Sequence, residues 1–375
     1  MKTYKHLYEV YCDRGTFSDG YDFSFQDGKL KRKKFSKVYF DPGFKDKAYD
    51  YALNFKRVYH TPKLIYDGLG KKQRNIIVPT VLEQIVHNMV YITMKPIFHT
   101  GLYEHSYGSI PDRGCYLGMK TIKKWIKKDS ENCKYCLKMD IRKFFESIPH
   151  DILIKKLRKI IKDEKFMYVL IEVIESAENG LPLGFYTSQW LANWYLQDFD
   201  HFVKEQLRAK YYIRYMDDMV IFDVSKETLH YFRKEIQKYL NERLGLTLKD
   251  NWQVFLFHYV KEDGSDGGRP LDFMGYKFYR NRITMRKRIM YRATQKARRM
   301  GKKEKPTIYD CQQMTAYLGW IDGTDTYQMY LDKVKPYVNI QDIKRRIANY
   351  NRRRSKEDNE NNMEQSRKHR KAKRR

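Results

Sequence analysis

Two adjacent aspartates interrupt an otherwise apolar segment, and this feature constrains the fold more than any other in the sequence. The segment reads YYIRYMDDMVIFDV, with Asp217 and Asp218 at its centre. Apolar runs on both sides of a short polar break predict a β-hairpin whose turn carries both acids. Adjacent carboxylates repel each other. The pair is therefore either a solvated turn without further function or the ligand of a bound cation.

A third acid stands at the end of a separate predicted strand. In KYCLKMD, residues 134–140, apolar and polar side chains alternate up to Asp140, which is typical of a half-buried strand. Three acids on neighbouring strand ends could hold two Mg²⁺ ions roughly 3.5–4 Å apart, with Mn²⁺ as a substitute. Such a pair of metals serves phosphoryl transfer, because one activates the attacking hydroxyl and the other stabilises the leaving pyrophosphate.

The segments around these acids carry a resemblance to a known family. In chain order they read KKQRNIIVP, SYGSIPDRG, KMDIRKFFESI, GLPLGFYTSQWLANWYL, YMDD, LGLTLKDNW and DFMGYKF. Together they resemble the ordered blocks of reverse transcriptases, from Arg74 to Tyr276 and more weakly through AYLGWIDGTDTYQMY to about Tyr350. The resemblance implies an α+β right-hand polymerase with fingers, a palm containing an antiparallel sheet, and a helical thumb. It also implies RNA-directed DNA polymerase activity, in which dNTPs extend a primer.

The resemblance assigns roles to individual residues. Asp140, Asp217 and Asp218 match the catalytic metal ligands, and Ile141 matches a ligand that contributes its backbone carbonyl. Phe145 matches the steric gate that leaves no room for a ribose 2′-hydroxyl, with core packing as the alternative. The residues expected to bind the nucleotide are Lys72, Arg74, Phe145, Leu183, Gly184 and Gln189, and those expected to position primer and template are Phe273, Met274, Gly275 and Tyr276.

The residue types in these assignments suit their roles. Guanidinium and ammonium groups pair with phosphate, which fits Arg74 and Lys72, although a solvated basic edge is the alternative. Gly184 would let the backbone approach the template base pair. For the segment 273–276, buried packing alone is the alternative to positioning the primer.

Two departures from the family pattern stand out. Most reverse transcriptases have Gln-Gly and Ser-Pro in the second palm block, where this chain has Leu183-Gly184 and Ser188-Gln189. This form resembles the enzymes of diversity-generating retroelements and related defence-associated groups, and it implies looser fidelity at template adenines. In the fourth block the usual lysine aligns near Trp252. Either Lys249 replaces it or that acid is absent, and a surface lysine is the alternative reading of Lys249.

The charge indicates a polyanionic partner. Lys and Arg number 75 against 46 Asp and Glu, which gives a formal net charge of +29 and favours nucleic acid. The expected partners are an RNA template and a DNA or RNA primer, and the resemblance also admits a structured non-coding RNA and a basic accessory protein. No run of about 18 apolar residues occurs, so no membrane partner is expected. Five scattered cysteines favour a reducing cytoplasm.

The sequence divides into four predicted regions. Residues 1–70 are an N-terminal extension and the start of the fingers, with short strands between Gly/Asp turns and a helix around 47–59. Residues 71–280 form fingers and palm, with Ser188 capping a helix, and 281–350 form the thumb. Residues 351–375 form a basic tail of almost no apolar content, which is expected to be disordered.

Three functions remain after this reading. The first is a reverse transcriptase of a diversity-generating retroelement, and the second is a reverse transcriptase of a bacterial antiviral defence system. The third, of another class, is an RNA-binding splicing factor of maturase type. The intact set of three acids argues against the third.

Overall fold

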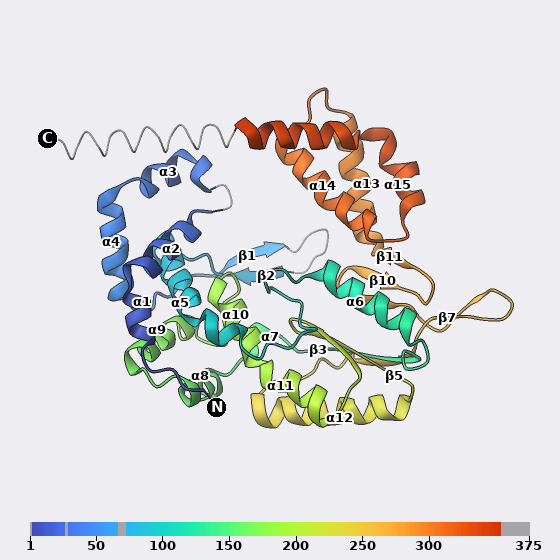
Figure 1. The fold of residues 1–375 in the computed structure, drawn as a ribbon, viewed down its shortest axis with the longest axis horizontal. Coiled ribbons are helices and arrows are strands. Elements are labelled where there is room, and N and C mark those ends of the chain that lie inside the picture. Colours follow the sequence, from blue (N-terminus) through green and yellow to red (C-terminus); the bar gives the residue numbers. More distant parts are fainter. Residues whose placement is uncertain (1, 27–28, 67–72, 354–375) are drawn as a thin grey trace. The chain divides into compact units, whose positions relative to one another are not determined.

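The computed structural model describes residues 2–26, 29–66 and 73–353, and the chain divides into two compact units (Figure 1). The first unit comprises residues 1–121 and 129–256, and the second comprises residues 122–128 and those from 257 onward. Lys72 and residues 354–375 of the predicted tail lie outside the described residues.

The first unit begins with helices, so the short strands expected in residues 1–70 were largely wrong. The described elements are α1 (Leu7–Cys12), α2 (Arg14–Ser24), the 3-10 turn η1 (Lys29–Lys31), α3 (Lys33–Tyr39) and α4 (Pro42–Leu53). Two Asp-containing motifs that suggested turns are helix N-caps: Asp13 accepts from the backbone N of Thr16, and Asp41 accepts from that of Gly43. Helix α4 starts at this cap and ends at Leu53, so it begins and ends earlier in the chain than the helix expected around 47–59.

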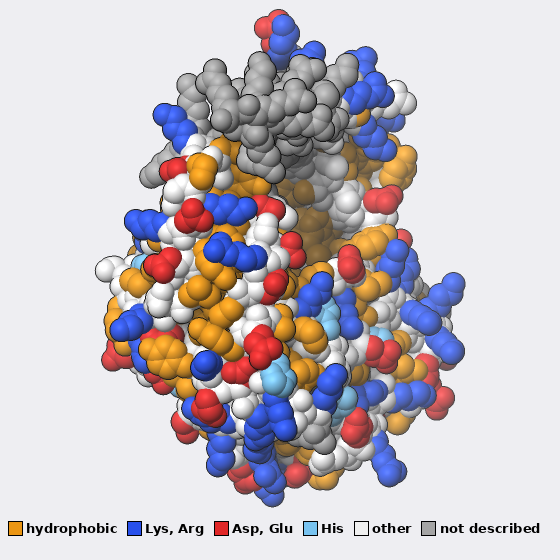
Figure 2. Space-filling view, turned by 60° about the vertical axis from the view of Figure 1, so that its left-hand side comes forward, with side chains coloured by type: hydrophobic (Ala, Val, Ile, Leu, Met, Phe, Trp, Pro, Cys, Tyr) orange, Lys and Arg blue, Asp and Glu red, His pale blue; other side chains and the backbone are white. Residues whose placement is uncertain are grey.

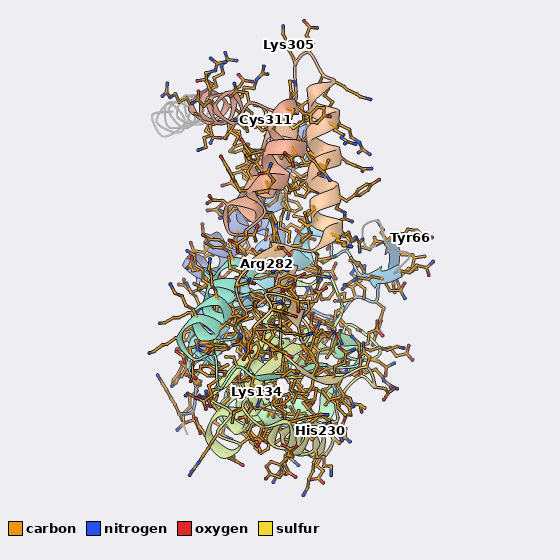
Figure 3. The ribbon with its side chains drawn as sticks, turned by 90° about the vertical axis from the view of Figure 1, so that its right-hand side faces the viewer. Tyr66, Lys134, His230, Arg282, Lys305 and Cys311 are labelled. Carbon is orange, nitrogen blue, oxygen red and sulfur yellow. The ribbon has the colours of Figure 1, made fainter. Side chains whose placement is uncertain are left out.

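A two-stranded ribbon follows. Strands β1 (Lys63–Tyr66) and β2 (Gln73–Ile76) pair antiparallel, and both present exposed side chains along almost their whole length. Figure 3 shows Tyr66 pointing outward from this ribbon. Helix α5 (Val81–His99) then starts at a capping box formed by Thr80 and Glu83, and packs against α2. Helix α6 (Cys115–Lys128) belongs to the first unit up to Thr121.

The remainder of the first unit is built around a four-stranded antiparallel sheet in the order β4-β5-β3-β6. The strands are β3 (Tyr135–Asp140), β4 (Tyr211–Tyr215), β5 (Asp218–Asp223) and β6 (Gln253–Leu256). Helix α12 (Lys226–Leu244) packs along β3, β5 and β6 (Figure 1). The other helical elements are α7 (Phe144–Ser147), α8 (His150–Ile160), α9 (Glu164–Ile174), α10 (Tyr186–Tyr195), α11 (Gln197–His201) and the π-helical turn η2 (Phe202–Gln206).

The second unit combines short strands with helices. Strands β7 (Tyr259–Val260) and β8 (Asp266–Gly267) form one ribbon, and β9 (Leu271–Phe273), β10 (Tyr276–Phe278) and β11 (Ile283–Met285) form a sheet in the order β11-β10-β9. The helices are α13 (Lys287–Gly301), α14 (Ile308–Asp322) and α15 (Tyr327–Lys333), followed by the turn η3 (Lys335–Tyr337) and helical residues 340–353. Buried Cys311 lies among these helices (Figure 3).

The mixture of helices and antiparallel sheets confirms the α+β prediction. None of the helices in the described part of the chain combines the length and apolar character needed to cross a bilayer. On the face shown in Figure 2, Lys and Arg side chains are spread among Asp and Glu rather than collected in one basic patch.

Candidate active site

The structure brings the three predicted catalytic aspartates to one end of the two central strands of the sheet. Strands β3 and β5 pair antiparallel in a register that sets Asp140 opposite Asp218. Asp217 occupies the β4–β5 turn together with Met216, whose φ of 55° is the left-handed conformation that tightens the turn. The backbone N of Ile141 donates to the carbonyl of Asp217 at 3.3 Å. The chain just after β3 is therefore hydrogen-bonded to the β4–β5 turn that carries Asp217.

The carboxylates of this cluster perturb one another. The pKa of Asp217 is raised to about 7, first by burial and then by the charge of Asp140 and a hydrogen bond with it. Asp140 forms an ion pair with Lys249, whose backbone N also donates to the Asp140 carbonyl at 2.8 Å. Lys249, which could have been a surface lysine, thus lies beside the acids although it is displaced from the usual family position. Its side chain is 30% exposed.

The side chains at this site are of the chemical type that binds divalent cations. In the described part of the chain, no three His, Cys, Asp or Glu side chains are grouped so that they could hold a metal as they stand. The register nevertheless places the hard oxygen ligands Asp140 and Asp218 side by side, and divalent cations would oppose the burial and the charge of Asp140 that together raise the pKa of Asp217. Ile141 forms an isolated antiparallel bridge with Leu248. The two hydrogen bonds of this bridge have the carbonyls of Asp140 and Thr247 as acceptors, so neither of them uses the carbonyl of the predicted ligand Ile141.

A buried ionic network supports the turn, and sequence reasoning missed it. Arg214 on β4 and Asp200 on α11 have side chains 0% and 1% exposed, joined by two hydrogen bonds of 2.6 and 2.8 Å. The second Nη of Arg214 donates to the carbonyl of Met216 at 3.0 Å and to Oδ1 of Asn193 at 3.1 Å. The signal that could have revealed it is a lone charge inside an apolar strand, because such a group needs a buried partner.

Two of the predicted nucleotide-binding residues, Leu183 and Gly184, contact the chain that follows the ribbon. The backbone N of Ile77 donates to the carbonyl of Leu183 at 2.8 Å. Gly184 has a φ of 114°, and a Cβ there would stand 2.1 Å from the carbonyl oxygen of Ile77, so only glycine permits this contact. Arg74 lies exposed on β2, three residues before Ile77.

Two further predicted residues, Phe145 and Gln189, lie on helices of the first unit. Phe145 is half-buried on α7, and its carbonyl accepts from the backbone N of Leu181 at 2.7 Å. Gln189 is half-buried on α10. The prediction that Ser188 caps this helix was wrong, because α10 begins at Tyr186 and Ser188 is buried within its first turn. Helix α10 starts before Ser188 because the chain already turns at Gly184, which has a positive φ.

The predicted primer-positioning residues lie in the second unit. Phe273 and Tyr276 are buried on β9 and β10, and the turn between them consists of Met274 and Gly275, both with positive φ. A Cβ on Gly275 would stand 2.7 Å from the ring of Trp320. The segment is therefore a tight hairpin that is fixed against α14, and its register sets Phe273 opposite Tyr276.

Comparison with known proteins identifies the family. Residues 67–278, more than half of the chain, match the family model of the reverse transcriptase (RNA-dependent DNA polymerase). The chain belongs to the reverse transcriptase family. This confirms the family named from the sequence blocks and the right-hand polymerase fold class that goes with it.

Curated relatives of this reverse transcriptase include two bacterial proteins. Group II intron-encoded protein LtrA of Lactococcus lactis subsp. cremoris is 28% identical over 212 residues, which cover 54% of this chain and 33% of that protein. Protein YkfC of Escherichia coli (strain K12) is 27% identical over 146 residues, which cover 36% of this chain and 38% of that protein. The chain thus spans about a third of the length of these relatives.

Solved structures similar to this reverse transcriptase include two telomerases. That of Candida albicans, in complex with a TWJ fragment of telomeric RNA, is 14% identical with a TM-score of 0.43, covering 78% of this chain and 59% of that chain. Apo telomerase from Candida tropicalis is 12% identical with a TM-score of 0.46, covering 75% of this chain and 60% of that chain.

Proposed function

We propose that this chain is an RNA-directed DNA polymerase that extends a primer with dNTPs by two-metal phosphoryl transfer. The observation that carries the proposal is the register that sets Asp140 opposite Asp218, with Asp217 in the adjoining turn. Membership of the reverse transcriptase family supports the same activity.

The proposed mechanism assigns the chemistry to these residues. Asp140, Asp217 and Asp218 would hold the two divalent cations, with the carbonyl of Ile141 as a further ligand. Such cations lower the pKa of an attacking hydroxyl and stabilise the charge on the leaving pyrophosphate. The network below the turn keeps the acids in fixed positions, so that little reorganisation accompanies the reaction.

The substrates are placed by the surrounding residues. Arg74, with Lys72, would pair with the triphosphate, and Phe145 would exclude a ribose 2′-hydroxyl. Gly184 leaves room for the base pair, with Leu183 and Gln189 beside it. Phe273, Met274, Gly275 and Tyr276 would position the primer end and the template.

Primer extension tests the proposal. The chain should extend a primer on an RNA template in the presence of Mg²⁺ and dNTPs, and omitting one nucleotide should stop synthesis at its complementary position. Chelation of the metal should abolish extension, and Mn²⁺ should restore it. Failure to incorporate any nucleotide on RNA or DNA templates with either metal would overturn the proposed activity.

A finer proposal concerns the biological role, which we assign to a diversity-generating retroelement. Leu183, Gly184, Ser188 and Gln189 support it, because an apolar residue at 183 removes an amide from the neighbourhood of the base pair. Misincorporation is expected to concentrate at template adenines. Leu183→Gln should lower the error frequency at adenines more than at other template bases, as measured by sequencing the products of one round of synthesis. An unbiased wild-type error spectrum, or one that Leu183→Gln leaves unchanged, would contradict this role.

Two alternatives have their own discriminating observations. A role in antiviral defence predicts a defence-type operon around the gene, whereas a retroelement predicts a nearby template and variable repeat. A maturase-like splicing role draws support from the similarity to LtrA, whose name describes a group II intron-encoded protein. That role predicts intron splicing that survives Asp217→Asn, because RNA binding without polymerisation would suffice.

A further inference from the structure

A pocket of about 430 Å³ lies in the first unit, among residues to which the proposed polymerase reaction assigns no role. Its walls come from α8, from α11 and the π-helical turn η2, and from the second half of α12 (Figure 1). The volume falls within the range of pockets that bind small ligands. Turns of π-helix are rare in proteins and often occur at functional sites. The pocket is therefore a candidate binding site that shares no residue with the proposed active site.

A largely buried ammonium forms one wall of this pocket. The side chain of Lys156 on α8 is 14% exposed, and its ammonium lies over the rings of Trp194 and Tyr195. Its Nζ donates to the carbonyl of Tyr195 at 2.8 Å and stands 3.1 Å from Oδ2 of Asp198. An ammonium has three donors, so these two contacts leave one donor for a ligand.

The positive charge of Lys156 is only partly compensated. Burial lowers the pKa of Lys156 although the charge of Asp198 acts to raise it, and the neighbouring charge of Lys159 lowers it further. The side chain of Asp198 is 68% exposed, so water screens its charge. An anion bound beside Lys156 would supply the missing negative charge.

Three further cations line the same pocket, namely Lys159 on α8 and both Lys238 and Arg243 on α12. Among the residues that the structure describes, none of these three side chains forms an ion pair with a carboxylate. Phosphate is the anion that suits several such cations, because its oxygens accept several charge-assisted hydrogen bonds at once. The cations therefore favour a phosphate group as the anion.

Acidic side chains in the pocket restrict the rest of the ligand. Glu235 and Glu242 lie on one face of α12 and line the pocket together with Asp198. Carboxylates at three positions would repel the repeated phosphates of an RNA or DNA strand, but they would accept hydrogen bonds from hydroxyl groups. The lining thus favours a single phosphate on a hydroxylated molecule over a polynucleotide.

An aromatic pair supplies apolar surface. The rings of Phe202 on η2 and Tyr239 on α12 stack with their centroids 4.4 Å apart and an interplanar angle of 23°. Both residues are half-buried and line the pocket. A surface of this kind suits contact with the face of a sugar or base ring.

We propose that this pocket binds a phosphate monoester whose phosphate is carried by a hydroxylated ring, as in a sugar phosphate or a nucleoside monophosphate. The phosphate lies beside the ammonium groups of Lys156 and Lys159. A ring hydroxyl donates to Glu235, and the ring rests against Tyr239. This site goes beyond the proposed polymerase function, and neither depends on the other.

Titration in EDTA tests the proposal, because the binding of dNTPs at the two-metal site needs the cations that EDTA removes. Ribose 5-phosphate and AMP are the probes, and at least one of them should bind saturably in calorimetry and raise the unfolding temperature. Inorganic phosphate lacks the ring contacts and should bind about 10-fold more weakly than that ester. Equal affinity for the two esters would assign the site to a sugar phosphate, and tighter binding of AMP would assign it to a nucleotide.

Two variants connect the binding to these residues. Lys159→Gln should weaken ester binding about 5-fold or more, because it removes a charged donor to the phosphate. Lys155→Gln, at an exposed position of the same helix outside the pocket, is the matched control and should leave the affinity unchanged. Glu235→Ala removes both a hydroxyl acceptor and a charge that repels phosphate, so the preference for the ester over inorganic phosphate should fall.

Three results would overturn the proposal. The first is ester binding no tighter than that of inorganic phosphate, and the second is ester affinity that Lys159→Gln leaves unchanged. The third is an effect of Lys159→Gln on the affinity for an RNA strand in the absence of ester binding, which would assign the pocket to a polynucleotide. Primer extension by Lys159→Gln should equal that of wild type, so failure of this site is distinguishable from failure of the polymerase function.

Discussion

Asp217→Asn is expected to abolish nucleotide incorporation, with a fall in rate of about 10³-fold or more. The substitution keeps the shape of the side chain but removes one of the anionic ligands that the two-metal mechanism requires. Single-nucleotide incorporation in Mg²⁺ measures the effect, and RNA binding in the same buffer should stay within about twofold, because binding depends on the basic surface. Asp46→Asn, at an exposed position on α4, is the control and should keep full activity.

The same substitution is expected to stabilise the metal-free protein. The pKa of Asp217 is raised to about 7 by burial and by Asp140, so the folded state favours the protonated form. The stability that the folded state gains from Asp217 is therefore fully present below the ordinary pKa of 3.8, and it is lost as the pH rises through 7. Thermal unfolding in EDTA should therefore show a larger gain for Asp217→Asn at pH 8 than at pH 5.

Metal binding should reverse the order of stability of wild type and Asp217→Asn. Divalent cations offset the repulsion that the wild-type carboxylates carry, so Mg²⁺ should raise the unfolding temperature of wild type more than that of Asp217→Asn. An Asp217→Asn protein that retains near wild-type nucleotide incorporation would contradict the assignment of the Asp217 carboxylate as a metal ligand. A stability gain that is equal at both pH values would contradict the electrostatic cause.

The part of the site that follows from local sequence was predictable. Apolar runs around Asp217 and Asp218 predicted the hairpin, and the run that ends at Asp140 predicted a strand; the structure confirms both elements and pairs them. Helix α12 likewise begins after a serine cap and ends at a glycine in the left-handed conformation, which are local signals for the start and end of a helix. In each case the local pattern and the tertiary packing favour the same structure.

The predictions that were wrong or missing concern segments whose local sequence pattern is compatible with more than one structure. Asp13 and Asp41 followed by glycines fit a turn as well as a helix cap, and the packing of α2 and α4 against α5 favours the two helices. Beyond the segment 273–276, β11 pairs with β10 as a third strand, which the local pattern does not show. The contact between Lys249 and Asp140 joins residues more than a hundred positions apart, and spacing cannot reveal it.

Arg214→Met is expected to destabilise the protein by about 3–5 kcal/mol, because it leaves the carboxylate of Asp200 buried without its charge partner. The same change on a surface ion pair should cost at most about 1 kcal/mol. Arg158→Met, whose partner Glu164 is 71% exposed, provides that control. Urea unfolding of the three proteins measures the difference.

Loss of stability alone would not show that Arg214 positions the catalytic turn, so a double variant separates the two effects. Arg214→Met with Asp200→Asn removes both charges, while the amide oxygen can still accept from the hydroxyl of Tyr212 that now bonds Asp200 at 2.7 Å. Much of the lost stability should return. Incorporation at saturating dNTP should remain depressed about 10-fold or more, because the carbonyl of Met216 still lacks the donor that holds it at 3.0 Å.

Two outcomes would contradict this positioning role. A double variant that regains full incorporation together with stability would mean that Arg214 serves only the fold. An Arg214→Met protein as stable as Arg158→Met would mean that the buried ion pair contributes no more to stability than a surface ion pair. If instead stability returns and the rate does not, the ionic network beneath β4 aligns the acids. Asp217 would then depend on a charge buried three residues before it as much as on its own carboxylate.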